Sequence, residues 1–231
     1  MKKLSIVIPV YNEEKTIAKL VDRVKKADSL GMEKEIIAVD DGSKDRSLSM
    51  LEGISGIRIV KHPQNRGKGA AIRTGLKVTT GDIVLIQDAD FEYDPADYPF
   101  LLKPILGNQA DVVYGSRLIS NQPRRVLNFH HYLANILITF LSNCFTNLNL
   151  SDIETGYKVF RREVVEFLLP KLVSDRFGIE VELTARVAKG KWRVYEVGIS
   201  YSGRTYEEGK KINWKDGIAA VWHVIRFNVF G

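Results

Sequence analysis

The sequence predicts an α/β fold built on a mainly parallel sheet with helices on both faces. In the first half, short apolar runs typical of buried strands alternate with segments whose apolar residues recur at helical spacing. Polar clusters follow several of these runs where each strand would end, and ligands bind at that edge in sheets of this kind. A chain of 231 residues is long enough for one large core, so we expect a single domain over residues 1–231.

The expected elements of the first half follow from these patterns. Apolar runs predict five strands, at Leu4–Val10, Glu35–Val39, Ile57–Val60, Ile83–Ile86 and Val112–Tyr114. Helical spacing predicts a helix whose apolar face comprises Ile17, Leu20, Val21 and Val24. A second helix, interrupted by glycines, is expected from about Gly67 to Val78.

The second half has a different pattern of apolar and polar residues. Leu127–Phe145 is an expected helix that is apolar around much of its circumference, and Trp214–Phe230 mixes aromatic with basic residues. Arg193–Tyr201 alternates as an edge strand or an antiparallel strand does. Polar residues keep the apolar run of the first helix short of the roughly 20 residues that span a bilayer. We expect part of that helix to pack in the core and part of the tail to lie at a membrane interface.

Composition narrows the choice of partners. There are 34 Lys and Arg residues against 28 Asp and Glu, and the formal net charge of +6 indicates anionic partners. No interleaved aromatic and basic repeat or DNA-binding motif is present, so no nucleic-acid partner is expected. The single cysteine, Cys144, excludes an intramolecular disulfide, favours a reducing cytoplasm and is expected to be a small buried hydrophobe. The amino terminus lacks the apolar region of a signal peptide.

Two carboxylates, Asp88 and Asp90, flank Ala89 just after the expected strand Ile83–Ile86. Two acidic side chains so close repel each other unless a cation lies between them. Mg²⁺ or Mn²⁺ suits such a pair, with diphosphate oxygens completing the coordination shell. An acidic turn is the alternative for Asp-x-Asp alone. The position of this pair beside other polar clusters therefore carries the prediction of a metal site.

Two further clusters close earlier strands. Pro9 suits a strand exit, Tyr11 offers a flat face to a base, and Glu13 offers a carboxylate to ribose or base donors. In Asp40-Asp41-Gly42-Ser43, one carboxylate can accept a hydrogen bond from a nucleobase imide while the glycine permits a tight turn. Capping turns at helix starts are the alternative for both clusters.

The segment Asn65-Arg66-Gly67-Lys68-Gly69 places two cations and two glycines at a helix start. Backbone N–H groups and the helix dipole favour a phosphate there, so Lys68 is a candidate for binding the nucleotide. The spacing is not that of a Walker A loop. The alternative is that the glycines merely allow the helix to pack closely on the sheet.

Together these motifs resemble family 2 glycosyltransferases, in the order of that family. The motifs are Pro9–Glu13, Val39–Ser43, Asn65–Gly69, Asp88–Asp90 and Tyr114-Gly115-Ser116-Arg117. Two later segments, Asp152–Lys158 and Gly203–Lys210, look like the polyprenol-phosphate branch, the dolichol-phosphate mannosyl- and glucosyltransferases. The resemblance covers nearly the whole chain. It implies a glycosyltransferase A-type, Rossmann-like fold, with residues 1–117 binding the nucleotide sugar and residues 118–231 forming a membrane-facing acceptor half.

The resemblance also implies roles for residues on the donor side. The nucleoside would be held by Pro9, Tyr11, Glu13 and Asp40. Asp88 and Asp90 would bind the metal, Mg²⁺ or Mn²⁺, directly or through water, and the backbone of Ala89 would lie near the ribose.

On the acceptor side, the resemblance assigns cations to phosphate groups. Arg117 matches the family's basic residue after the fifth strand, and Arg204 with Lys210 matches a basic pair on a loop that closes over the donor diphosphate or the acceptor phosphate. With Asp90, these three are the expected catalytic residues. Arg124 or Arg125 is a further candidate for the acceptor phosphate.

The chain departs from the mannosyl pattern at two places. Glu92 stands where dolichol-phosphate mannosyl synthases commonly carry a Gln that contributes to the metal site, so Glu92 is a candidate third metal contact. The segment Arg66–Gly69 looks more like the glucosyl-type members. These two differences favour UDP-glucose over GDP-mannose as the expected donor.

The expected activity is metal-dependent, inverting transfer of a hexose to a polyprenyl or dolichyl phosphate by a protein peripheral to the cytoplasmic face of the membrane. A phosphate acceptor is largely deprotonated at neutral pH and needs no general base, and the sequence offers no isolated His–Asp pair to act as one. One alternative is transfer to a saccharide or other hydroxyl, with Asp152 or Glu154 recruited as base. Another is a non-catalytic subunit that binds nucleotide sugars.

Overall fold

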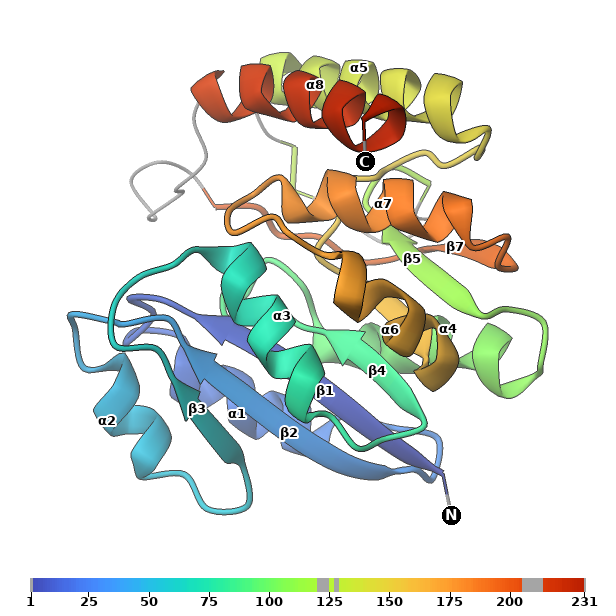
Figure 1. Cartoon of the computed structure of the whole chain (residues 1–231). Helices are drawn as coiled ribbons and strands as arrows, with labels where there is room; N and C mark the ends of the chain where they lie inside the picture. The colour runs from blue at the N-terminus through green and yellow to red at the C-terminus, as the bar shows by residue number, and fades with distance from the viewer. Residues whose placement is uncertain (1, 120–124, 127–128, 205–213, 231) are drawn as a thin grey trace.

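A computed structural model describes residues 2–119, 125–126, 129–204 and 214–230, and it is a sheet covered by helices on both faces (Figure 1). Seven strands form the sheet in the order β3-β2-β1-β4-β6-β5-β7. Their bounds are β1 Lys3–Val10, β2 Glu33–Asp40, β3 Arg58–Lys61, β4 Ile83–Ile86, β5 Val112–Ser116, β6 Lys158–Arg161 and β7 Val194–Gly198. All pairings are parallel except those of β6, which runs antiparallel to both β4 and β5. The predicted α/β fold with a mainly parallel sheet is confirmed.

Apolar packing divides the helices between the two faces of the sheet. One core cluster joins the strands to α1 Ile17–Lys26, α2 Ser47–Glu52 and α4 Tyr98–Leu106. The other joins them to α3 Lys68–Val78, α6 Arg162–Leu168 and α7 Ile179–Lys189. Two short 3₁₀ turns cover Pro95–Asp97 and Leu169–Lys171. The helical spacing predicted for α1 is confirmed, because its four apolar positions are fully buried.

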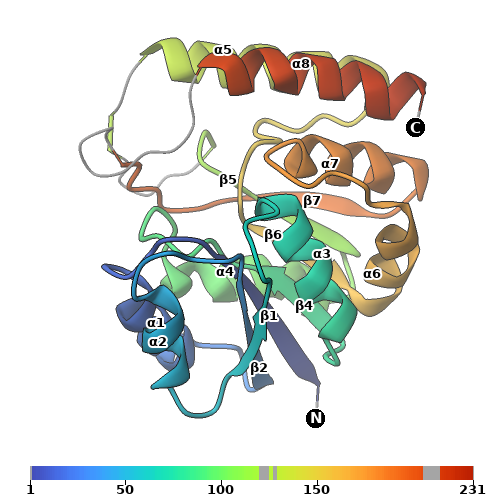
Figure 2. The same ribbon diagram turned by 60° about the vertical axis from the view of Figure 1, so that its left-hand side comes forward.

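Two long helices form an outer layer above α7 (Figures 1 and 2). They are α5 Phe129–Thr146 and α8 Trp214–Val229, which lie side by side. None of the described helices combines the length and the apolar character needed to cross a bilayer.

The segment Arg193–Tyr201, expected to be an edge strand or an antiparallel strand, contains β7, which lies at the sheet edge and runs parallel to β5. The antiparallel strand is instead β6, which the sequence reading did not predict. Cys144 is exposed rather than buried, because it lies on the part of α5 that faces away from the core.

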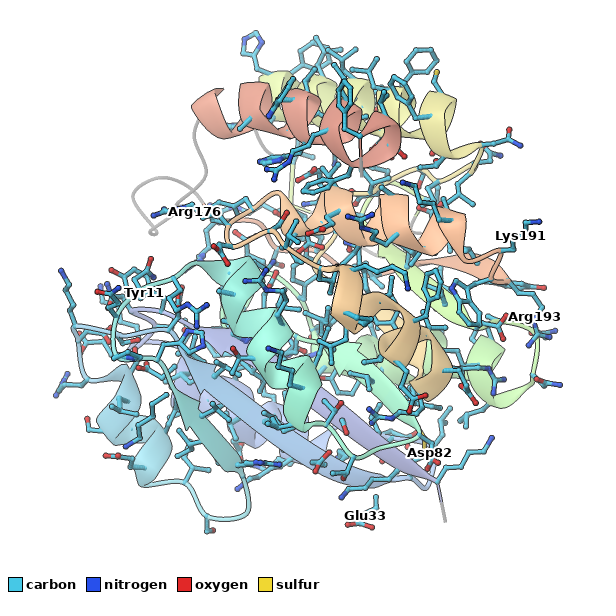
Figure 3. All side chains as sticks on the ribbon, viewed as in Figure 1. Tyr11, Glu33, Asp82, Arg176, Lys191 and Arg193 are labelled. Atoms are coloured by element: carbon cyan, nitrogen blue, oxygen red, sulfur yellow. The ribbon has the colours of Figure 1, made fainter. Side chains whose placement is uncertain are left out.

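The strand directions bring the predicted motifs to one edge of the sheet. Figure 3 shows Tyr11, which follows β1, far from Glu33 and Asp82, which lie at the opposite ends of β2 and β4. Because β6 runs the other way, its first residue, Lys158, reaches the same edge and pairs in register with Ile86. The loop before β6 therefore enters the site from the acceptor half.

Candidate active site

Arg204 lies among three acidic side chains that come from two distant parts of the sequence. Its Nη2 donates to Asp90 Oδ2 at 2.7 Å and its Nη1 to Glu13 Oε2 at 3.3 Å. Its backbone N–H donates to Glu92 Oε1 at 2.9 Å. The hydroxyl of Tyr201 donates to the other oxygen of Glu92 at 3.0 Å. The segment after β7 thus closes against the loop after β4.

Asp88 has a different cationic partner. Lys68, the first residue of α3, places its Nζ 2.7 Å from Asp88 Oδ1 and 2.9 Å from Glu180 Oε1. Gly156 approaches closely on the other side, because a Cβ at that position would lie 2.2 Å from Asp88 Oδ2. Any side chain at residue 156 would displace the carboxylate.

Asp41 fixes the loop that leads to Lys68. Its two oxygens accept the backbone N–H groups of Arg66 at 2.9 Å and Gly67 at 2.7 Å, and His62 Nδ1 lies 2.7 Å away. Gly67 has a φ of +101°, and a Cβ there would lie 2.4 Å from the carbonyl oxygen of Asp175, so the position requires glycine. The loop is therefore held by internal bonds before any ligand arrives.

Asp40 has an unused acceptor. The residue is 2% exposed, and its Oδ2 accepts the backbone N–H of Ser43 at 3.2 Å. Its Oδ1 is buried with no hydrogen-bond partner. A buried carboxylate oxygen without a donor is costly, and a ligand N–H would satisfy it. Of the two neighbouring acids, Asp40 is thus the one open to a base, since Asp41 is occupied.

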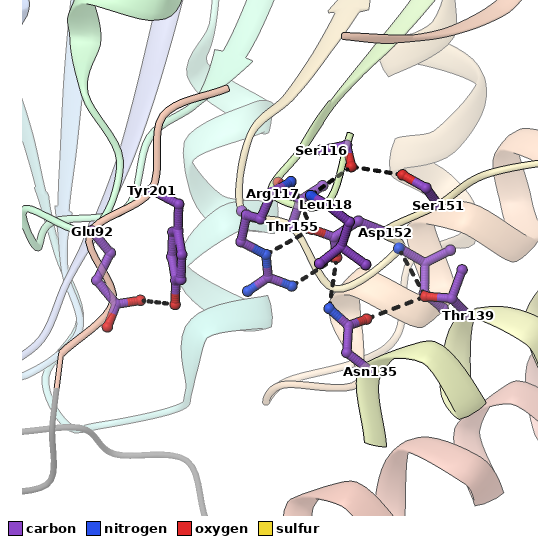
Figure 4. A network of polar contacts seen from close by, with 12 residues as sticks. Glu92, Ser116, Arg117, Leu118, Asn135, Thr139, Ser151, Asp152, Thr155 and Tyr201 are labelled. Carbon is purple, nitrogen blue, oxygen red and sulfur yellow. Dashed lines mark hydrogen bonds and ion pairs between the residues drawn. The ribbon is translucent and has the colours of Figure 1, made fainter. Parts of the chain in front are cut away.

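Arg117 forms a separate, buried centre (Figure 4). Its Nε and Nη2 each lie 2.7 Å from one oxygen of Asp152, which is fully buried. Asn135, on α5, donates to Asp152 Oδ1 at 3.0 Å. The guanidinium also lies 5.2 Å from the ring centroid of Tyr201. Although burial raises it, the contact with Arg117 holds the pKa of Asp152 below its usual value.

Negative charge is in excess around Asp90. Burial, together with the carboxylates of Asp88 and Glu92, raises the pKa of Asp90 to about 7, against the opposing effect of Arg204. Counting Glu13 as well, four carboxylates face two cations, Lys68 and Arg204. In the part of the chain that the structure describes, no three His, Cys, Asp or Glu side chains are already arranged as a metal-ligand group. The excess of carboxylates over cations and the oxygen donors nevertheless fit a hard divalent cation.

The remaining predicted residues vary in their relation to these centres. Pro9 is the penultimate residue of β1 and Tyr11 follows the strand, at the same sheet edge as Asp40. The carbonyl of Ala89 accepts the Thr16 hydroxyl at 3.0 Å. Arg125 is exposed, and its Nη1 donates to the carbonyl of Gly203 at 3.2 Å. Arg124 and Lys210 lie outside the described residues.

Sequence reading missed the residues that hold these centres in place. Glu180 and Lys158 are buried charges that pair with each other, and their partners are distant in the sequence. Asn135 lies in an otherwise mainly apolar helix and belongs to none of the motifs. Lys158 lies near the site because β6 is antiparallel to its neighbours, and the sequence pattern did not indicate that direction.

Comparisons with known proteins identify the family of the chain. The family model described as "Glycosyl transferase family 2" matches residues 5–169. A dolichyl-phosphate beta-glucosyltransferase from Trichomonas vaginalis is 27% identical over 242 residues, covering 98% of this chain and 73% of that protein. A UDP-N-acetylglucosamine–dolichyl-phosphate N-acetylglucosaminyltransferase from Methanococcus voltae is 25% identical and covers 97% of this chain and 95% of its own length.

A solved structure shares the fold. Glucosyl-3-phosphoglycerate synthase from Mycobacterium tuberculosis, crystallised with Mn²⁺, UDP and phosphoglyceric acid, superimposes with a TM-score of 0.77 at 22% identity, covering 99% of this chain and 79% of that one. The family model matches well over half of the residues, and the relatives extend over almost all of them. The chain therefore belongs to glycosyl transferase family 2 and is a glycosyltransferase.

Proposed function

We propose that the protein transfers a hexose or N-acetylhexosamine from a UDP-sugar to a polyprenyl phosphate, with inversion at the anomeric carbon. The proposal rests on one observation: the site has two separate charged centres, and one aromatic ring contacts both of them. An acidic centre around Asp90 suits the metal and diphosphate of the donor, and a partly exposed guanidinium at Arg117 suits an acceptor phosphate. Tyr201 contacts both, since it bonds Glu92 and lies beside Arg117.

On the donor side, the unsatisfied Oδ1 of Asp40 would accept the imide N–H of the uracil, with Tyr11 as a neighbouring flat surface. Lys68, the first residue of α3, would face the diphosphate. The name of the Methanococcus voltae relative specifies UDP-N-acetylglucosamine, which favours a UDP-linked sugar over GDP-mannose. The Mn²⁺ and UDP of the structural relative support the same class of donor.

A divalent metal, Mg²⁺ or Mn²⁺, would be held by Asp88, Asp90 and Glu92. Bound there, it would supply Lewis-acid stabilisation of the departing nucleoside diphosphate. The cationic groups of the chain then add to this charge compensation: Lys68 lies at Asp88, and Arg204 lies at Asp90 and Glu92.

On the acceptor side, Arg117 would bind and orient the phosphate while Asp152 holds its Nε and Nη2 in place. Arg125 and the undescribed Arg124 and Lys210 are further candidates for the same phosphate. A phosphate oxygen needs no base, so the task of the protein is to aim it at the anomeric carbon opposite the leaving group. A single displacement gives a β-linked sugar phosphate from an α-linked donor.

The outer layer of helices suits a lipid acceptor. Large apolar side chains are exposed along α5 and α8, namely Phe129, Tyr132, Leu133, Ile136, Leu137, Phe140, Phe145, Trp222 and Val229. The eighteen residues of α5 include no charged Asp, Glu, Lys or Arg. Exposed Arg125 and Arg226 offer charge to anionic headgroups. We take the occupant of this face to be a lipid bilayer, because the polyprenyl chain of the acceptor resides there.

Vesicle flotation tests this surface. Replacing Phe140→Asp puts a charge in the middle of the exposed face of α5, and we expect binding to vesicles of anionic phospholipid to fall at least about tenfold. Phe100→Asp, at an exposed phenylalanine on α4 that lies apart from this layer, is the matched control and should bind as wild type. Equal binding by the Phe140→Asp variant would contradict the membrane assignment.

A radiolabel assay tests the reaction itself. Incubation with labelled UDP-glucose, UDP-N-acetylglucosamine or GDP-mannose, polyprenyl phosphate and Mn²⁺ should place label in a chloroform-soluble product that mild acid releases. We expect one of the UDP-sugars to give that product. Label only in water-soluble glycan would refute the lipid acceptor.

Transfer to a hydroxyl is the second candidate, and Glu154 favours it. Burial and the neighbouring Glu180 raise the pKa of Glu154 to about 7, and its Oε1 is buried without a hydrogen-bond partner. Such a carboxyl is poised to act as a base at neutral pH. In the same assay, Glu154→Gln should leave transfer to polyprenyl phosphate within a few fold of wild type. A loss of roughly a hundredfold or more would favour the hydroxyl mechanism.

A further inference from the structure

Lys158 and Glu180 form a charged pair in the interior of the protein. Lys158 begins β6 and is fully buried, and Glu180, in the first turn of α7, is 3% exposed. Their side chains are in direct ion-pair contact. Desolvating two charges costs several kcal/mol, and apolar residues of similar volume often stabilise a core equally well. The pair therefore calls for a role other than stability.

Glu180 extends this pair to the donor side of the site. Its Oε1 lies 2.9 Å from Lys68 Nζ, which in turn lies 2.7 Å from Asp88 Oδ1. Charges of alternating sign therefore run from the interior of the protein to Asp88, which the sequence predicts to be a metal ligand.

Lys158 extends the pair to the acceptor side. Its Nζ also donates to the carbonyls of Ile153 and Thr155, at 3.1 and 2.5 Å. These carbonyls belong to the turn between Asp152, which binds Arg117, and Gly156, which packs against Asp88. One ammonium group thus contacts both the turn that positions the acceptor arginine and the acid that positions the donor lysine.

We infer that Lys158 and Glu180 are positioning residues that set the donor cation Lys68 and the turn before β6 at a fixed relative placement. The inference rests on the proposed function, in which Lys68 faces the donor diphosphate and Arg117 faces the acceptor phosphate. Neither Lys158 nor Glu180 touches the reacting atoms. Glu180 acts by anchoring the ammonium of Lys68 from behind, so that this group stays in place when the diphosphate binds.

Calorimetric titration with UDP in the presence of Mn²⁺ tests the donor branch. Glu180→Gln keeps the shape of the side chain and removes its charge, and we expect UDP affinity to fall roughly tenfold or more, as for other residues that orient a ligand-binding group. Because Lys158 would then be buried without its partner, Lys158→Met/Glu180→Leu is made in parallel. This double variant removes both charges and should remain folded in urea titration, yet show the same loss of UDP affinity.

A double-mutant cycle separates positioning from simple packing. If Glu180 acts through Lys68, then adding Glu180→Gln to Lys68→Met should cause no further loss of UDP affinity. Additive losses of UDP affinity in this cycle would overturn the inference. So would a folded Lys158→Met/Glu180→Leu variant that binds UDP as wild type does. Failure of wild type to bind UDP would count against the proposed function and this inference together. Normal UDP binding by wild type without lipid product would count against the acceptor alone.

Discussion

Asp90→Asn is expected to lower turnover about a thousandfold, equivalent to roughly 4 kcal/mol of transition-state stabilisation. Asp90 is the acid at which the charges converge, since it bonds Arg204 and lies beside Asp88 and Glu92. The amide keeps the size of the side chain but weakens the hold on a divalent cation. Titration of Mn²⁺ followed by electron paramagnetic resonance should show a matching loss of affinity.

A measurement of folding stability shows whether the loss of turnover in Asp90→Asn has a cause other than unfolding. Four carboxylates around two cations repel one another, so removing one charge should not lower the urea midpoint of the metal-free protein. Asp94→Asn is the matched control, because Asp94 pairs with Arg23 at the surface and should keep wild-type turnover. Chelation of metal by EDTA should mimic the Asp90→Asn variant in wild type. Full turnover in EDTA, or in Asp90→Asn, would rule out the metal assignment.

Asp152→Asn is expected to cost roughly 3–5 kcal/mol of unfolding free energy, because it strands the guanidinium of Arg117 in a buried site. The carboxylate accepts two side-chain bonds and the backbone N–H from Arg117, and another from Asn135. The same change at Asp22, which pairs with Lys26 across one exposed helical turn, should cost less than about 0.5 kcal/mol. Urea denaturation monitored by circular dichroism compares the two directly.

We also expect Asp152→Asn to weaken the binding of the acceptor. With its partner gone, Arg117 loses the bonds that orient it, so the KM for polyprenyl phosphate should rise more than the KM for the UDP-sugar. Equal costs at Asp152 and Asp22 would mean that the buried pair contributes no more than a surface pair. An unchanged acceptor KM in folded Asp152→Asn would remove Arg117 from the acceptor site.

The first half of the fold was predictable because its strands are continuous apolar runs buried on both faces. β4, for example, is Ile-Val-Leu-Ile with every residue buried, and the acidic motif follows at its carboxyl end. β6 was not predicted, because it lies outside the alternation of strands and helices that marks the first half, and its first residue is a lysine that the fold buries completely. Only the tertiary pairing of Lys158 with Glu180, twenty-two residues away, makes such a residue acceptable inside a sheet.

The candidate site divides in the same way. The acids and cations that face the ligands fall in local motifs, so their types and spacing could be read from the chain. The groups that hold them do not: Glu180 lies on a helix whose charged positions are typical of a solvent-facing surface, yet it is buried. Residues of this kind are recognised only when distant segments meet, which no local pattern records.

The place of β6 in the sheet also constrains how the chain acquires its structure during synthesis. β4 and β5 are not neighbours, because β6 is hydrogen-bonded between them. A nascent chain that has emerged only as far as β5 therefore leaves β4 with an open, apolar edge and β5 without its strand partners. The sheet closes only after β6 has left the ribosome, and until then chaperones would have reason to bind β4.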